Sequence, residues 1–282
     1  MDISSLRAFV CVAENSSFSR ASEQLYLTQP AVSKRIATLE SELDTTLFDR
    51  IGRNISLTES GQALLPRARR ILLEIEDSRR TISNLSGQVG GRLSIATSHH
   101  IGLHRLPPVL RRYTSRYPQV ELDLRFIASE DACRAIRQGE LELGIITLPL
   151  ESPTDLKTRE VWDDHLAVVS SVSHPLAIKK SLSLAQLLKH PAILPNPGTY
   201  TRKIVERAVM QTVSVRMSTN YLETIKMLVS IGLGWSVLPE NMLNAELKVL
   251  KVANMNISRK LGLVWHPERT LSNAAQAMME ML

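Results

Sequence analysis

The first 89 residues carry apolar positions at helical spacing, which predicts a segment built mainly from helices. A first amphipathic helix is marked by Leu6, Phe9, Val10 and Ala13. Two more helices with a very short join are predicted over residues 17–43. Ser17 can cap the first, Thr28 or Gln29 ends the join, and Pro30 suits the first turn of the second. That second helix has an apolar stripe that we expect to be buried, made of Val32, Ile36, Leu39 and Leu43.

The opposite face of the second helix opens with small and polar residues. Gln29, Pro30 and Ser33 come first, and the cations Lys34 and Arg35 follow. Such a face suits a helix that enters the DNA major groove, because bulky side chains would keep its backbone out. The pattern alone fits an ordinary pair of surface helices equally well.

Residues 47–58 favour DNA binding, because they read as a strand, a Gly-containing turn and a strand. This predicts a small β-wing with Arg50 and Arg53 at its tip, placed for phosphate or minor-groove contact.

A long helix is predicted over residues 58–88. Its apolar positions step by 4 and 3 in strict alternation, with one small polar break at Ser78. A helix facing its own core usually has a wider stripe, so the narrow seam favours a coiled coil that pairs two copies. The expected dimerisation residues are Leu64, Ala68, Ile71, Ile75, Ile82 and Leu85.

These segments together resemble the N-terminal winged helix-turn-helix of the LysR-type transcriptional regulators. The match is long and spaced, and includes Ser17-Phe18, Ala21-Ser22, Thr28-Gln29-Pro30-Ala31-Val32-Ser33, Leu39-Glu40, Leu47-Phe48, Leu57-Thr58 and Gly61. Lys34-Arg35 departs from the Arg–polar pair of many relatives but keeps the charge.

The resemblance implies a homodimer or homotetramer that reads an interrupted palindrome in double-stranded DNA, one half-site per subunit. It also implies regulation by a small-molecule effector and contact with RNA polymerase. No cofactor is expected.

Beyond Gly90-Gly91, short apolar strands alternate with amphipathic helices, which predicts an α/β domain with mostly parallel sheets. The predicted organisation is therefore multidomain α+β: a winged helix-turn-helix (1–58), a linker helix (59–89) and an α/β effector domain (90–282). The resemblance implies that this last domain is a two-subdomain, periplasmic-binding-protein-like (type 2) fold. Subdomain I would comprise about 91–161 and 266–282, and subdomain II about 162–265.

Composition and charge refine this interpretation. The chain has 282 residues and a net charge of +6, but residues 1–89 hold 11 basic and 11 acidic side chains. DNA binding must therefore rest on where the cations stand, and the basic excess beyond residue 89 hints at an anionic small ligand. The two cysteines, Cys11 and Cys133, read as free thiols of a reducing compartment, so we expect a cytoplasmic protein without a membrane span.

Candidate effector residues lie where strands end and helices begin, since ligands of open parallel sheets bind there. Singly, each Ser, Thr or Gly at such a place is more often a helix cap than a ligand residue. Family precedent favours Ser98, Ser129 and Thr199. Helix ends alone fall short of a micromolar affinity, so side chains such as His100, Thr201 or Arg202 would have to contribute. The full candidate set is Ser98, His100, Ser129, Thr147, Gly198, Thr199 and Thr201.

Other chemistry has weak support in the sequence. His100 and His104 have a metal-compatible spacing but no evident third ligand. A redox switch between the two cysteines is disfavoured because they fall in separate domains. Residues 232–236 match neither a nucleophile elbow nor a dinucleotide fingerprint, so we expect no enzyme activity. The alternative is a small-molecule-binding protein or enzyme whose N-terminal helices only dimerise it.

Overall fold

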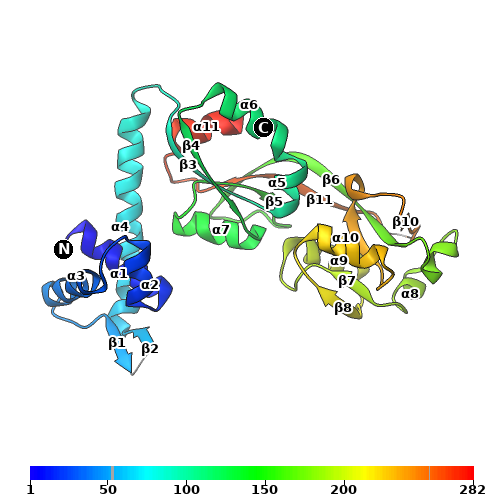
Figure 1. Cartoon of the computed structure of the whole chain (residues 1–282), viewed down its shortest axis with the longest axis horizontal. Coiled ribbons are helices and arrows are strands. Elements are labelled where there is room, and N and C mark those ends of the chain that lie inside the picture. Colours follow the sequence, from blue (N-terminus) through cyan, green and yellow to red (C-terminus); the bar gives the residue numbers. More distant parts are fainter. Residues whose placement is uncertain (52–53, 254) are drawn as a thin grey trace. The chain divides into compact units, whose positions relative to one another are not determined.

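The computed structural model describes residues 1–51, 54–253 and 255–282. Its contacts divide the chain into two compact units, Met1–Ser86 and Gly87–Leu282. Figure 1 labels the helices and strands of both units. None of the helices in the described part of the chain is both long and apolar enough to cross a membrane.

The N-terminal unit begins with three helices, α1 (Ile3–Asn15), α2 (Phe18–Gln24) and α3 (Gln29–Glu42). The predicted cap of α2 is present, since the Ser17 hydroxyl accepts from Arg20 N–H. Thr28, one of the two residues predicted to end the join, caps α3, and its hydroxyl accepts from Ala31 N–H. Val32, Ile36 and Leu39 are fully buried, as their spacing predicts. Leu43 is not: it is the C-terminal cap of α3 and is 38% exposed, because the helix ends before that position can face the core.

The predicted wing is present as the antiparallel pair β1 (Phe48–Ile51) and β2 (Asn54–Leu57). The pair continues into α4 (Glu59–Asn84), whose cap Thr58 accepts from the N–H of Gly61. Gly61 lies against the backbone before β1: a Cβ there would sit 2.2 Å from the Leu47 carbonyl oxygen. This close approach requires glycine and brings α4 directly against the base of the wing.

Helix α4 is shorter than the predicted helix of residues 58–88, since it ends at Asn84. Its first half belongs to the core of its own unit. Ala68 is fully buried there and Leu64 packs against the same cluster, so Ala68 is not available to a second helix as the seam predicted. The second half differs: Ile82 is 70% and Leu85 80% exposed. Ile71, in the first half, is 37% exposed, so the most exposed apolar positions of the predicted seam lie at its C-terminal end.

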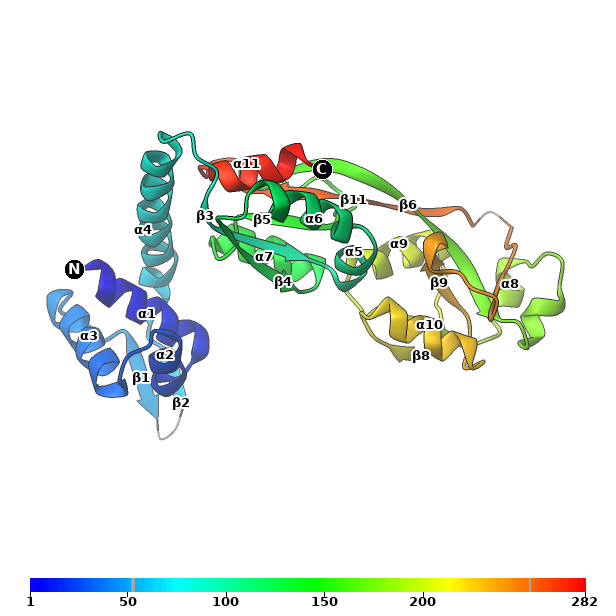
Figure 2. The same cartoon turned by 45° about the horizontal axis from the view of Figure 1, so that its top comes forward.

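The C-terminal unit is built on a mixed sheet in the order β10-β6-β11-β5-β3-β4, with β9 also paired to β6. One lobe, called lobe I, contains the helices α5 (His99–His104), α6 (Leu106–Arg116), α7 (Ser129–Gln138) and α11 (Asn273–Glu280). Helices α6 and α11 lie side by side (Figures 1 and 2), where the Tyr113 hydroxyl donates to the Ala274 carbonyl at 2.8 Å. Its strands are β3 (Gly91–Thr97), β4 (Val120–Phe126) and β5 (Leu143–Thr147).

Side chains alternate between the two faces of this sheet, as strand geometry requires. Leu93 and Ile95 of β3 pack with α6 and α11, whereas Ala96 packs with α7 on the other face. Strand β3 runs parallel to both β4 and β5, so the C-terminal ends of the three strands lie at the same edge of the sheet. The N-termini of α5, which follows β3, and of α7, which follows β4, lie at that edge.

The second lobe, called lobe II, contains α8 (Leu184–Leu187), α9 (Tyr200–Val209) and α10 (Leu222–Ser230). Its short strands are β7 (Ala192–Leu194), β8 (Val215–Ser218), β9 (Ser236–Pro239) and β10 (Leu247–Val249). Two 3-10 turns, Pro175–Ile178 and Glu240–Met242, complete it.

Two long strands join the lobes (Figure 2): β6 (Lys157–Ser171) and β11 (Ile257–Trp265). The short apolar runs at 166–170 and 261–265 predict strands there, which cover only the C-terminal parts of β6 and β11. Both strands run antiparallel to all their described neighbours, so four of the six described pairings in the large sheet are antiparallel. The expectation of mostly parallel sheets is wrong, because the chain crosses between the lobes by a long antiparallel pair instead of helical crossovers.

Candidate functional site

One candidate site is the exposed start of helix α3. Gln29, Pro30 and Lys34 are exposed, and Ser33 and Arg35 are half-buried. Pro30 lies in the first turn, where its missing N–H costs no hydrogen bond. The structure thus places the five residues on the first turns of one helix, and their contacts with DNA stay predictions.

The wing is tied to α3 by a carboxylate. Glu40, near the end of α3, accepts from the backbone N–H of Leu47 at 2.7 Å and of Phe48 at 3.4 Å. These bonds fix the direction in which β1 leaves the helix bundle. Arg50 lies in β1, but its side chain is outside the described residues, and so is Arg53 altogether. Their place at the wing tip stays a prediction.

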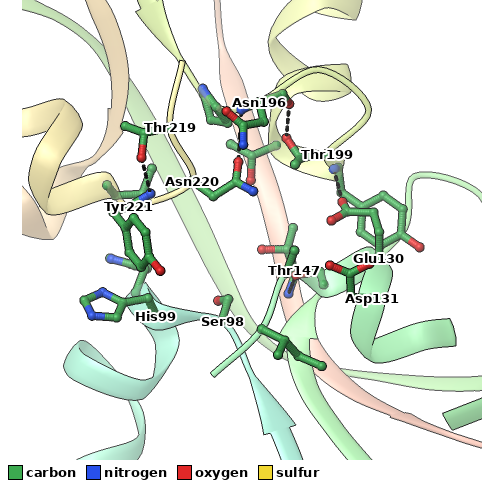
Figure 3. Close-up of a pocket in the computed structure, with 18 of the residues that line it drawn as sticks. Ser98, His99, Glu130, Asp131, Thr147, Asn196, Thr199, Thr219, Asn220 and Tyr221 are labelled. Carbon is green, nitrogen blue, oxygen red and sulfur yellow. Dashed lines mark hydrogen bonds between the residues drawn. The ribbon is translucent and has the colours of Figure 1, made fainter. Parts of the chain in front are cut away.

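A second candidate site is a pocket of about 640 Å³ between lobes I and II of the C-terminal unit (Figure 3). Lobe I contributes residues at or just after the ends of β3, β4 and β5, and lobe II contributes those at or just after the ends of β7 and β8. Arg259 of β11 completes the lining.

Six of the seven predicted effector residues line this one pocket: Ser98, His100, Ser129, Thr147, Thr199 and Thr201. Ser98 precedes α5 but makes no capping hydrogen bond, so a cap does not explain its hydroxyl. Ser129 accepts from the Thr147 N–H at 3.2 Å, whereas Thr199 does cap α9. Their binding roles stay predictions.

Two expected contributors lie elsewhere. Gly198 is not among the residues that line the pocket; its φ of +87° shows that it serves the turn before α9. Arg202 is buried against its own helix, where it donates to Glu206 at 2.6 Å and to the Pro195 carbonyl at 3.3 Å. Neither residue is placed to contact a ligand in the pocket.

Contacts across the pocket connect the two lobes on both sides. Glu130 at the start of α7 accepts from the backbone N–H of Tyr200 at the start of α9 (Figure 3). On the other side His104 lies 2.7 Å from Glu223, and the rings of His99 and Tyr221 stack edge to face at 5.2 Å. The structure therefore holds the lobes together around the pocket.

One charged cluster, called the charged floor, was not predicted from the sequence: Arg259 lines the pocket, and its ion-pair partners Asp164 and Arg105 are not among the lining residues. Arg259 Nε donates to Asp164 at 2.8 Å and Arg259 Nη1 to the Thr201 hydroxyl at 2.8 Å. Arg105 reaches the other oxygen of Asp164 at 3.2 Å. Arg259 and Asp164 face each other in the β6–β11 register although 95 residues separate them. Both strands have more than one charged residue, and nothing in the sequence identifies which of them form a pair.

His100 is buried beside this floor. Burial, and next the cation of Arg259, lower the pKa of His100 to about 3, so its imidazole is neutral near pH 7. Its ring lies 4.8 Å from that of His104. Among the described residues no group of three or more His, Cys, Asp or Glu could hold a metal ion.

The two cysteines are buried in different units. Burial is the largest cause that raises the pKa of both the Cys11 and the Cys133 thiols. Raised pKa values lower the thiolate fraction, which is the reactive form. Their surroundings give neither thiol an evident redox role.

Two family models match the chain in succession. Residues 3–62 match the bacterial regulatory helix-turn-helix protein, lysR family, and residues 86–282 match the LysR substrate binding domain. A helix-turn-helix unit followed by a two-lobed unit with an interlobe pocket defines a one-component transcriptional regulator. The chain belongs to the LysR family of transcriptional regulators, whose members are regulators and not enzymes.

Similar proteins align with almost the whole chain or with part of it. A probable RuBisCO transcriptional regulator of Cyanophora paradoxa is 31% identical over 288 residues, covering 98% of this chain and 89% of that protein. An HTH-type transcriptional regulator of Azotobacter vinelandii is 67% identical over 108 residues, covering 38% of this chain and 75% of that protein.

Solved structures show the same architecture. A full-length variant of OxyR from Pseudomonas aeruginosa aligns with a TM-score of 0.70 at 25% identity, covering 100% of this chain and 93% of that one. Full-length CbnR complexed with its target DNA aligns with a TM-score of 0.65, covering 100% and 98%. Its identity of 18% makes that likeness one of fold alone.

Proposed function

We propose that this regulator binds an interrupted palindrome in promoter DNA as a dimer or tetramer and is switched by a small anionic effector in the interlobe pocket. It acts in the cytoplasm, through RNA polymerase. Each recognition helix reads one half-site, and the second half of α4 pairs the subunits. CbnR, which shares the fold, is described in complex with its target DNA.

The observation that carries the proposal is the pocket with a buried cation. Arg259 lines it together with the hydroxyl-bearing residues that end the neighbouring strands. A thermal-shift screen with a metabolite library should therefore find stabilising compounds among anions. The promoter fragment upstream of the gene should bind the protein, and the same compounds should change that affinity.

The wing arginines test the DNA-binding part of the proposal. Replacing both Arg50 and Arg53 by Gln should weaken binding to all DNA sequences alike, because phosphate contacts carry no base information. The slope of log K against log salt should flatten by about one unit for each lost contact. Fluorescence anisotropy over a salt series measures both, with Arg67→Gln on exposed α4 as the control. Retained affinity with altered site preference would contradict the assignment.

Gln29 tests base reading. Its exposed side chain at the start of α3 can pair with adenine in the major groove. Gln29→Ala should change the preference at one or two positions per half-site, at a cost of ~1–3 kcal/mol for the favoured base, while non-specific affinity stays the same. Selection from randomised sites compares the two proteins, and Gln211→Ala in the other unit is the control. Identical consensus sequences would leave specificity to Ser33, the wing or DNA shape.

A further inference from the structure

The floor of the interlobe pocket has more positive charge than its own carboxylate balances. Asp164 is shared by two guanidinium groups, with Arg259 Nε at 2.8 Å from one oxygen and Arg105 Nη2 at 3.2 Å from the other. Arg259 is 5% exposed and the Asp164 side chain 1%. Because arginine stays protonated in proteins, the group of Arg105, Asp164 and Arg259 has a net charge of +1.

Several buried side-chain nitrogens at this floor make no hydrogen bond to the described residues. Arg259 Nη2, Arg105 Nε and both ring nitrogens of His100 have no hydrogen-bond partner among the described residues. Arg259 already uses Nε for Asp164 and Nη1 for Thr201, so Nη2 is its nitrogen that makes no hydrogen bond. Buried donors without acceptors are unfavourable, and an acceptor that reached this floor would be bound strongly.

His100 adds a donor to this floor without adding charge. Its lowered pKa keeps the ring neutral near pH 7, so one ring nitrogen carries a hydrogen. The charge to be balanced therefore stays at one unit.

The pocket also has acidic side chains. Glu130 and Asp131, both in the first turn of α7, line it (Figure 3). Glu130 binds the Tyr200 N–H and Asp131 pairs with Arg134 at 2.8 Å, an exposed pair that solvent screens. A second negative group on a ligand would face these carboxylates, whereas a neutral or cationic group would not be repelled.

We propose that the effector is a monocarboxylate, anchored at the pocket floor by the Arg259 guanidinium, with its neutral or cationic remainder toward Glu130 and Asp131. The inference rests on the proposed function, in which this pocket holds the effector. A planar carboxylate matches the guanidinium and carries the one charge that the floor lacks. Dicarboxylates, and phosphate in its dianionic form, bring a second charge that Glu130 and Asp131 disfavour.

Simple probes test the proposal with the full-length protein. Propionate should bind saturably in the millimolar range by calorimetry at constant ionic strength. Propionamide, of the same shape without the charge, should bind far more weakly. Succinate and inorganic phosphate should also bind more weakly than propionate. Arg259→Gln should weaken propionate binding by at least about thirtyfold, because it removes the buried partner of the charge. Arg111→Gln, on exposed α6, should leave binding unchanged.

Several results would contradict the proposed carboxylate site. Absence of saturable propionate binding at tens of millimolar, equal binding of propionamide, or undiminished binding by Arg259→Gln would overturn the proposal. Phosphate or succinate that binds as tightly as propionate would overturn the monocarboxylate class.

Folding of the variants needs its own check, because Arg259→Gln leaves Asp164 with Arg105 alone. Arg259→Lys is the second variant: it keeps the charge but not the guanidinium fork, so it should still lose most of the propionate affinity. If neither variant folds, the propionate–propionamide comparison on the wild type decides alone. Site-specific DNA binding by the wild type is measured in parallel. If the wild type does not bind its promoter DNA, that result counts against the proposed function and not against the carboxylate site.

Discussion

Ile82→Asp is expected to convert the regulator from a dimer into a monomer. Ile82 lies near the end of α4, 70% exposed in a single chain and flanked by the equally apolar and exposed Leu85. If the second half of α4 pairs with a second copy, the substitution places two carboxylates in one desolvated seam. Burying an unpaired charge costs several kcal/mol per ion, so the dimer dissociation constant should rise by about a thousandfold or more.

Sedimentation or light scattering of the full-length variant measures the change, and DNA affinity should fall with it because one half-site is lost. Ser83→Asp adds the same charge at a neighbouring exposed polar position of α4 and is the matched control. A variant with the mass of the wild type would remove this half of α4 from the interface. Since Ile82 contributes little to the core of its own unit, loss of folding does not confuse the result.

His100 should make the stability of the C-terminal unit depend on pH. Its pKa in the folded protein is about 3, against 6.5 for an ordinary histidine. Between these values the unfolded chain binds the proton and the folded chain does not, so stability is complete above about pH 6.5 and falls as the pH is lowered. The loss is about 1.4 kcal/mol per pH unit, of the order of 4 kcal/mol by pH 3.

Urea unfolding followed by tryptophan fluorescence measures this loss, since all three tryptophans, Trp162, Trp235 and Trp265, lie in the C-terminal unit. The difference between the wild type and His100→Leu isolates the single proton from the carboxylates that titrate in the same range. Leu103→Ala, at an exposed position of the same helix, controls for general weakening of α5. A difference that stays constant from pH 7 to pH 4 would contradict the prediction, because it would show that His100 has the same pKa in the folded and the unfolded chain.

Local signals account for what the sequence predicted. The α2–α3 join follows from Ser17, Thr28 and Pro30, because a cap and a proline act on the turn in which they stand. The strand ends that line the pocket were predictable for the same reason: each is a short polar segment between two regular elements. The prediction that Leu43 is buried was wrong, because apolar spacing does not tell where a helix ends.

The rest depends on pairings between distant parts of the chain. The antiparallel β6–β11 pair brings residue 164 to residue 259, and no periodicity within either strand specifies that partner. The charged floor of the pocket is a product of this pairing, so it could not be predicted before the topology was known. The burial of Ala68 is similar, because it depends on how α4 packs on α1 rather than on its own heptads.

The long pair β6–β11 also sets how the two lobes can move. The strands remain paired from Ile257 to Trp265, apart from one register shift between Leu261 and Gly262. At that shift a Cβ on Gly262 would lie 2.2 Å from the Arg159 carbonyl oxygen, so the two backbones are in close contact. A change in the angle between the lobes must therefore twist a two-stranded ribbon, and the paired strands resist that twist elastically. Arg259 is part of this ribbon, so a twist of the ribbon also moves the cation that lines the pocket.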